Sequence, residues 1–274
     1  MKILLVVGFF LVFFLVTAFA AAPTTMGDVS IDEYYERSQR SMEDALALAN
    51  KVFEMERGQE GQDGDAYKMY FADVQALTES VRYNLRMAAE GGHPVAPYLL
   101  ANILVEERIT DPEKRKARDG EVCRLYQVSA DRKLLAGALA LFNRCNESFL
   151  RFQAEGPEIQ KMIEDLENSL EVNDPSKDYY PLPSKQSICF REDKIPDLAA
   201  LDSFSKVMAA VAPAMLTYEQ FKADAYYLLA MMPGGNNRSD ILEKIERVNF
   251  AKSLGCNDEF KLQQAFEKDL STAQ

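Results

Sequence analysis

The sequence predicts an all-α fold in which antiparallel helix hairpins stack as an irregular solenoid. Three observations predict it. Apolar residues recur at the three- and four-residue spacing of amphipathic helices, and no alternating run bounded by hairpin turns predicts a strand. Residues typical of helix ends separate these segments. Two helix pairs also repeat about forty residues apart, which is typical of solenoids because each pair buries its apolar face only against the next.

The first twenty or so residues are typical of a secretory signal peptide. Lys2 provides the positive start, residues 3–16 form an apolar run, and residues 18–20 (Ala-Phe-Ala) suit signal peptidase. We therefore predict a leader over residues 1–20 and a periplasmic or secreted protein. The apolar run approaches the length that spans a bilayer, so an uncleaved membrane anchor is the alternative.

The N-terminal half, residues 21–172, is predicted to be a run of helix hairpins. Ser30 and Glu33 form a capping box before the first helix, and the polar, glycine-rich residues 58–64 predict a loop. Gly91 and Gly92 predict the end of the second helix. Further helices are expected over residues 94–107, 121–130 and 134–144 and from Pro157 onward, with a charged connection over residues 111–120.

Residues 173–196 interrupt the helical pattern, and we expect them to form an ordered, proline-rich connection pinned by a disulfide. They contain Pro175, Pro181, Pro183, Pro196 and Cys189. The C-terminal half, residues 197–274, is again predicted to be helical. Its expected helices cover residues 198–212 and 217–231, the second opened by a capping box, then residues 239–255 and a last helix after position 257.

Four cysteines lie beyond the leader, and an even number in an exported chain predicts two disulfides. Cys123 and Cys145 lie eleven residues on either side of position 134, at the turn of a predicted hairpin. Such positions have the same height in antiparallel helices, so we predict Cys123–Cys145 and, by elimination, Cys189–Cys256. A zinc site is disfavoured because no two cysteines are close in sequence.

Charge restricts the class of partner. The chain contains 31 Lys and Arg against 43 Asp and Glu, a net charge of −12. Such a surface repels phosphate backbones, so we expect a protein partner, of basic character, and no nucleic acid. Membrane contact is expected only if the leader stays as an anchor. The candidate partner-binding residues are the basic cluster Lys114, Arg115, Lys116 and Arg118 in the charged connection and the aromatic pair Tyr179 and Tyr180.

Each group has a structural alternative: the basic cluster as a solvated loop, and the aromatic pair as packing within the fold.

No catalytic, cofactor or metal site is predicted. His93 is the only histidine, and its place in a turn has a structural explanation. The carboxylate pairs Glu106/Glu107 and Glu164/Glu167 match the residue types of a glycosidase but do not differ from solvated helix faces. We therefore expect a protein that is not an enzyme.

The repeat suggests a family. Residues 81–90 align with residues 122–131 at an offset of 41, and residues 96–101 with residues 135–140 at an offset of 39. Residues 87–101 (MAAEGGHPVAPYLLA) resemble the Sel-one-like repeat, a branch of the tetratricopeptide-like solenoids. The chain departs from that pattern in three places. Leu104 stands where the family has a tyrosine, and the second copy of the repeat, which begins at residue 122, lacks the glycine. Residues 173–196 fit no repeat.

The resemblance implies a scaffold for protein–protein contacts and, more sharply, an inhibitor or immunity protein of a secreted toxin. Two alternatives remain open: a structural component of an envelope assembly, and a carboxylate-dependent glycan hydrolase.

Overall fold

The computed structural model describes residues 29–58, 64–145, 156–171, 174–190, 213–232, 237–258 and 260–272. In this part of the chain the fold is mostly helical with neighbouring helices packed together, which confirms the all-α class. The predicted leader and the predicted helix over residues 198–212 lie outside the described residues. The described residues form two compact units, one ending at Leu125 and the other beginning at Tyr126, so residues 174–190 belong to the second unit.

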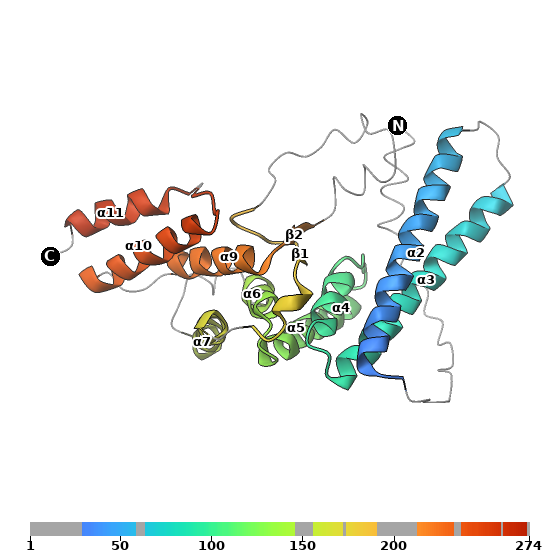
Figure 1. Ribbon diagram of the computed structural model, residues 1–274, viewed down its shortest axis with the longest axis horizontal. Helices are drawn as coiled ribbons and strands as arrows, with labels where there is room; N and C mark the ends of the chain where they lie inside the picture. The colour runs from blue at the N-terminus through green and yellow to red at the C-terminus, as the bar shows by residue number, and fades with distance from the viewer. Residues whose placement is uncertain are drawn as a thin grey trace. The chain divides into compact units, whose positions relative to one another are not determined.

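The first unit is dominated by a long antiparallel hairpin of α2 (Ile31–Gly58) and α3 (Gly64–Gly91) (Figure 1). The Ser30 hydroxyl accepts a hydrogen bond from the Glu33 N–H at 3.1 Å, so the predicted cap forms. The hydroxyls of Ser41 and Ser80 lie 3.0 Å apart across the hairpin. The short helix α4 (Ala96–Val105) packs on α3 and is buried over most of its length, which explains its continuous apolar sequence.

The second unit surrounds the buried helix α9. Its helices are the end of α5 (Pro112–Asp131), α6 (Leu135–Arg144), α7 (Pro157–Glu171), α9 (Tyr218–Met231), α10 (Arg238–Ser253) and α11 (Leu262–Thr272). Helix α6 packs against α7 and α9, and α10 lies between α9 and α11 (Figure 1). The predicted capping box opens α9, with Thr217 and Gln220 bonded reciprocally. Tyr227 and Val248 are fully buried where α9 meets α10.

The expectation that the chain contains no strand is wrong. A 3-10 turn, η2 (Lys177–Tyr179), precedes β1 (Leu182–Ser184), which pairs antiparallel with β2 (Ala214–Leu216). Leu182 lies opposite Leu216, and both side chains are buried. Strands of three residues are too short to show alternation of apolar and polar residues, so the pattern that predicts strands is absent from the sequence.

The expected charged connection over residues 111–120 is also wrong, because α5 already begins at Pro112. The Asp111 carboxylate accepts hydrogen bonds from the N–H groups of Glu113 (2.9 Å) and Lys114 (3.1 Å). Asp before a Pro at the first helical position is a strong start for a helix. The charge run obscured this start, although exposed charges are compatible with a helix.

Three helices of the chain end in the same way. Each is followed, one or two residues after its last residue, by a residue with positive φ: Gly92 (+108°), Lys133 (+67°) and Gly255 (+96°). The next residue donates its N–H to a carbonyl five residues earlier: His93 to Ala88 (2.9 Å), Leu134 to Ser129 (3.1 Å) and Cys256 to Ala251 (3.0 Å). The first two turns are related by the offset of 41 found in the sequence, so these two equivalent positions share a turn geometry.

Candidate functional site

The disulfide between Cys189 and Cys256 joins the proline-rich segment to the turn after α10. It is the pair that the sequence favoured. Cys123 and Cys145 are disulfide-bonded as well, and the structure describes no free cysteine. The chain therefore has the two disulfides expected of it.

Asp224 holds the segment that carries this disulfide. Its Oδ1 accepts hydrogen bonds from the N–H groups of Cys189 (2.8 Å) and Ile188 (3.0 Å) and from the Ser187 hydroxyl (3.1 Å). The residue is 1% exposed. Burial raises the pKa of Asp224 above its ordinary value, and the three hydrogen bonds oppose this shift. Nothing in the sequence distinguished Asp224 from other helical carboxylates, because its partners lie far away along the chain.

The aromatic pair of the proline-rich segment has a packing role. The Tyr180 hydroxyl donates to Asp174 Oδ2 (2.9 Å) and accepts the N–H of Ala136 (3.2 Å), while the same carboxylate oxygen accepts the N–H of Leu135 (3.0 Å). These groups satisfy the first donors of α6. The Tyr180 ring also meets the Phe221 ring edge-on, with centroids 5.4 Å apart. Tyr180 is therefore part of the fold, and its neighbour Tyr179 in η2 is half-buried.

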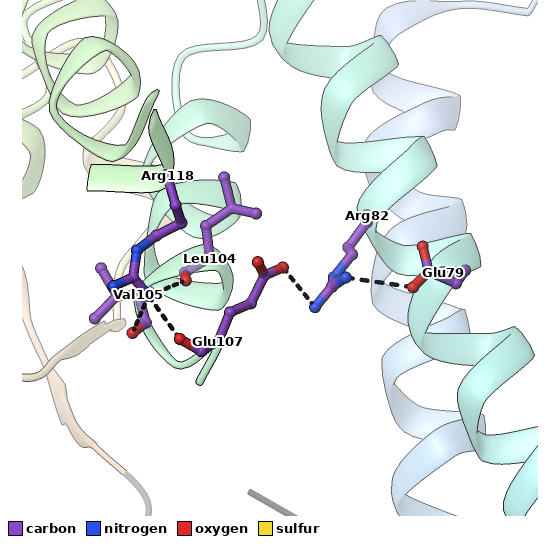
Figure 2. Close-up of polar contacts among 6 residues, drawn as sticks. All are labelled: Glu79, Arg82, Leu104, Val105, Glu107 and Arg118. Carbon is purple, nitrogen blue, oxygen red and sulfur yellow. Dashed lines mark hydrogen bonds and ion pairs between the residues drawn. The ribbon is translucent and has the colours of Figure 1, made fainter. Parts of the chain in front are cut away.

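The Arg118 side chain likewise forms its hydrogen bonds within the fold. Its Nη1 atom donates to the carbonyl oxygens of Leu104 (3.2 Å), Val105 (3.2 Å) and Glu107 (2.7 Å) at the C-terminus of α4 (Figure 2). A guanidinium suits this place because the last carbonyls of a helix have no intrahelical donor. Of the predicted basic cluster, Lys114, Arg115 and Lys116 remain exposed on the first turns of α5.

One carboxylate of each pair considered for glycosidase chemistry forms an ion pair with an arginine. Glu107 forms an ion pair with Arg82 (2.8 Å), and both side chains are 15% exposed; Arg82 also reaches Glu79 on its own helix (Figure 2). In the other unit, Glu167 pairs with Arg247 at 2.7 Å. Glu107 and Glu167 are therefore each engaged in an ion pair within their own unit.

His93 has the structural role expected from its turn. Its Nδ1 atom accepts hydrogen bonds from the N–H groups of Val95 and Ala96, both at 3.2 Å, at the start of α4. Its ring stacks on that of Tyr35, with centroids 4.1 Å apart. The side chain is 2% exposed. His93 therefore joins α2 to the α3–α4 turn.

The second unit presents an aromatic pair among carboxylates. Phe250 on α10 is 46% exposed, and its ring lies 4.8 Å from that of Tyr226 on α9. The structure leaves Tyr226 half-buried. We call the surface formed by these two rings and the charged side chains around them the Phe250 face; its residues are Tyr226, Phe250, Glu167, Glu171, Glu243, Glu246 and Arg247.

Among the described residues, three charged groups lie within electrostatic reach of the Tyr226 hydroxyl: Arg247 and Glu171 of the Phe250 face, and Glu219 on α9. Burial is the main cause that raises the pKa of Tyr226, and the carboxylates of Glu171 and Glu219 raise it further. Arg247 opposes them. Its guanidinium is shared between Glu167 on α7 and Glu243 on α10, which fixes these two helices to each other.

Comparison with protein-family models, with curated proteins and with solved structures finds no match to this chain. In the described part, no helix is long and apolar enough to cross a membrane, and no group of three His, Cys, Asp or Glu side chains is placed to hold a metal ion. The structure thus defines a mostly helical, disulfide-bonded protein with exposed apolar side chains.

Proposed function

We propose that this chain is an exported helical protein that acts by binding another protein. The observation that carries the proposal is the exposure of large apolar side chains on a surface that is otherwise charged. In the described residues they lie on the α2–α3 hairpin and on the second unit: Ile31, Met42, Leu46, Met69, Tyr83, Met215, Leu242, Phe250 and Phe260. Aromatic and methionine side chains are enriched where proteins meet, and Met42 and Leu46 lie one helical turn apart on α2.

Two further features support export and a basic partner. Disulfides persist mainly in oxidising compartments such as the periplasm and the extracellular medium, and the leader over residues 1–20 provides the route. The net charge of −12 favours a partner of opposite charge and raises the rate of encounter with it. A glycan hydrolase is less well supported, because Glu107 and Glu167 are each paired with an arginine.

The sharper form of the proposal is an inhibitor or immunity protein of a secreted toxin. It is supported by the resemblance of residues 87–101 to the Sel-one-like repeat and by the shared geometry of the α3–α4 and α5–α6 turns. The structural component of an envelope assembly is the alternative if the leader stays attached.

The test is affinity capture of exported proteins from the source organism with the tagged mature chain, followed by calorimetry with each purified candidate. We expect one specific protein, bound with a Kd below about 1 µM, the range of stable complexes. Recovery of no specific protein contradicts the proposal. N-terminal sequencing of the exported chain tests the leader: a start at Ala21 supports cleavage, whereas a chain that begins at Met1 and sediments with membranes supports the anchored alternative.

A further inference from the structure

The Phe250 face combines two features that together select one kind of ligand. Its centre is an aromatic pair in which the exposed Phe250 rests against the half-buried Tyr226, with ring centroids 4.8 Å apart. Packing against Tyr226 limits the motion of the Phe250 side chain, so little conformational entropy is lost when a partner covers it. The π face of an aromatic ring attracts cations.

Carboxylates outnumber cations around this pair. Glu246 precedes Phe250 by one helical turn on α10, and Glu243 precedes Glu246 by almost one turn. Glu167 and Glu171 approach from the end of α7. Arg247 is held between Glu167 and Glu243, and Lys222, one turn before Tyr226 on α9, pairs with Glu219. Glu171 and Glu246 are exposed and form no ion pair with any residue that the structure describes.

We infer that the Phe250 face is a docking surface for a cationic segment of a partner protein, rich in Arg or Lys. A guanidinium or ammonium group stacks on the Phe250 ring while neighbouring cations pair with Glu171 and Glu246. This inference rests on the proposed function and adds the site and the chemistry of the partner.

The charge pattern decides between occupants. An acidic segment is repelled by the four carboxylates, and a purely apolar helix leaves Glu171 and Glu246 desolvated without a partner, which is costly. A cationic segment satisfies both the rings and the carboxylates. Arginine suits the face better than lysine, since its planar group stacks on a ring and pairs with a carboxylate at the same time.

The test uses the full mature protein, with both disulfides formed, and a fluorescein-labelled peptide of alternating Arg and Gly. A twin peptide with citrulline in place of Arg has the same shape without the charge. Binding is measured by fluorescence anisotropy at low and at physiological ionic strength. The variants are Phe250→Ala and the pair Glu171→Gln with Glu246→Gln. Their matched controls are Phe260→Ala, an exposed aromatic before α11, and Glu158→Gln at the opposite end of α7.

We expect the wild-type protein to bind the Arg peptide and not the citrulline twin, more weakly as salt increases. Phe250→Ala is expected to weaken binding about three- to tenfold, the range of a cation–π contact. The double Gln variant is expected to weaken it by a similar factor and to reduce the salt dependence. Both controls should stay within about twofold of wild type. All these side chains are exposed, and circular dichroism checks that each variant is folded.

Three results overturn the inference: no binding of the Arg peptide, equal binding of the citrulline twin, or equal losses in Phe250→Ala and Phe260→Ala. Different results would contradict the docking surface and the proposed function. If a captured partner binds the Phe250→Ala variant as tightly as wild type, the docking surface is wrong while partner binding stands. If the wild-type chain captures no partner, the proposed function is wrong whatever the peptide does.

Discussion

Oδ1 of Asp224 lies 2.8 Å from the backbone nitrogen of Cys189. The segment before the disulfide is therefore held twice, by the covalent bond to Cys256 and by a carboxylate on the buried helix α9. Both attachments lie in the same cluster of buried side chains, which includes Tyr227 and Val248. This relationship makes the stability of the second unit sensitive to the protonation of Asp224.

The first prediction concerns Asp224→Asn. Because burial raises the pKa of Asp224 in the folded protein, the native state binds a proton more tightly than the unfolded chain does. The resulting stabilisation is fully present below the ordinary pKa of 3.8 and is lost as the pH rises through the folded-state pKa. In that interval the wild-type free energy of unfolding should fall by up to about 1.4 kcal/mol per pH unit relative to the variant.

Urea unfolding of both proteins between acidic and neutral pH checks this difference. Asn keeps an oxygen that accepts the hydrogen bonds of Cys189 and Ile188, so the variant is expected to fold. A difference in unfolding free energy that does not change with pH would contradict the role assigned to the carboxylate.

Asp258→Asn should show the opposite dependence. Burial raises the pKa of Asp258, but hydrogen bonds from the Tyr227 hydroxyl and from the N–H groups of Leu262 and Gln263 outweigh it and lower the pKa overall. The contribution of Asp258 to the free energy of unfolding is therefore present above its pKa in the unfolded chain. It is lost as the pH falls through its pKa in the folded protein. At neutral pH the variant should be less stable than wild type, because Asn replaces a charged acceptor of three hydrogen bonds by a neutral one. The same urea series measures this loss, which should shrink at acidic pH.

Gly137→Ala is expected to destabilise the chain by about 1–3 kcal/mol. A Cβ at Gly137 would lie 2.5 Å from Cβ of Ser129 and 3.1 Å from the backbone nitrogen of Ala130, so α5 and α6 would have to separate. Gly120→Ala is the matched control, since a Cβ there meets nothing within 4 Å. In an open helical position, Ala should stabilise by up to about 1 kcal/mol. Thermal unfolding distinguishes the two signs, and a stabilised Gly137→Ala variant would refute the close approach.

The shared turn geometry predicts opposite effects at two equivalent positions. Gly92 has φ +108°, so Gly92→Ala should destabilise by about 1–2 kcal/mol through backbone strain. Lys133 occupies the equivalent place with φ +67°, and Lys133→Gly should stabilise by up to about 1 kcal/mol. Chemical denaturation measures both. The equivalence of the turns is disproved if Lys133→Gly destabilises as strongly as Gly92→Ala.

Arg118→Met should cost about 2 kcal/mol of unfolding free energy, because three carbonyl oxygens at the end of α4 lose a charged donor. Methionine retains much of the apolar stem, which limits the loss of packing. Lys116→Met on the exposed side of α5 is the control and should change stability by less than about 0.5 kcal/mol. Equal effects of the two substitutions would show that the contacts of Arg118 do not stabilise the fold.

Much of the helical architecture follows from local chemistry. The capping residues Ser30 and Thr217 act at the predicted helix starts, and Gly92 and Gly255 at the predicted helix ends, because caps and positive-φ turns involve residues close in sequence. The β1–β2 ribbon was not predicted, because its strands are short and pair with residues that are distant in sequence. The start of α5 was detectable from Asp111 and Pro112, but the surrounding charges were given more weight.

The candidate site shows more clearly what could not be predicted from the sequence. Of the predicted partner-binding residues, Arg118 and Tyr180 contribute to the fold, whereas Phe250 and Glu246 were not singled out and lie exposed beside each other on α10. The sequence alone determined the helical class, two disulfides, the acidic charge and the predicted leader, since these depend on composition and local order. Only the tertiary structure decided which polar groups are satisfied inside the protein and which face the solvent. That choice depends on burial and on hydrogen-bond partners tens of residues away, such as Cys189 for Asp224.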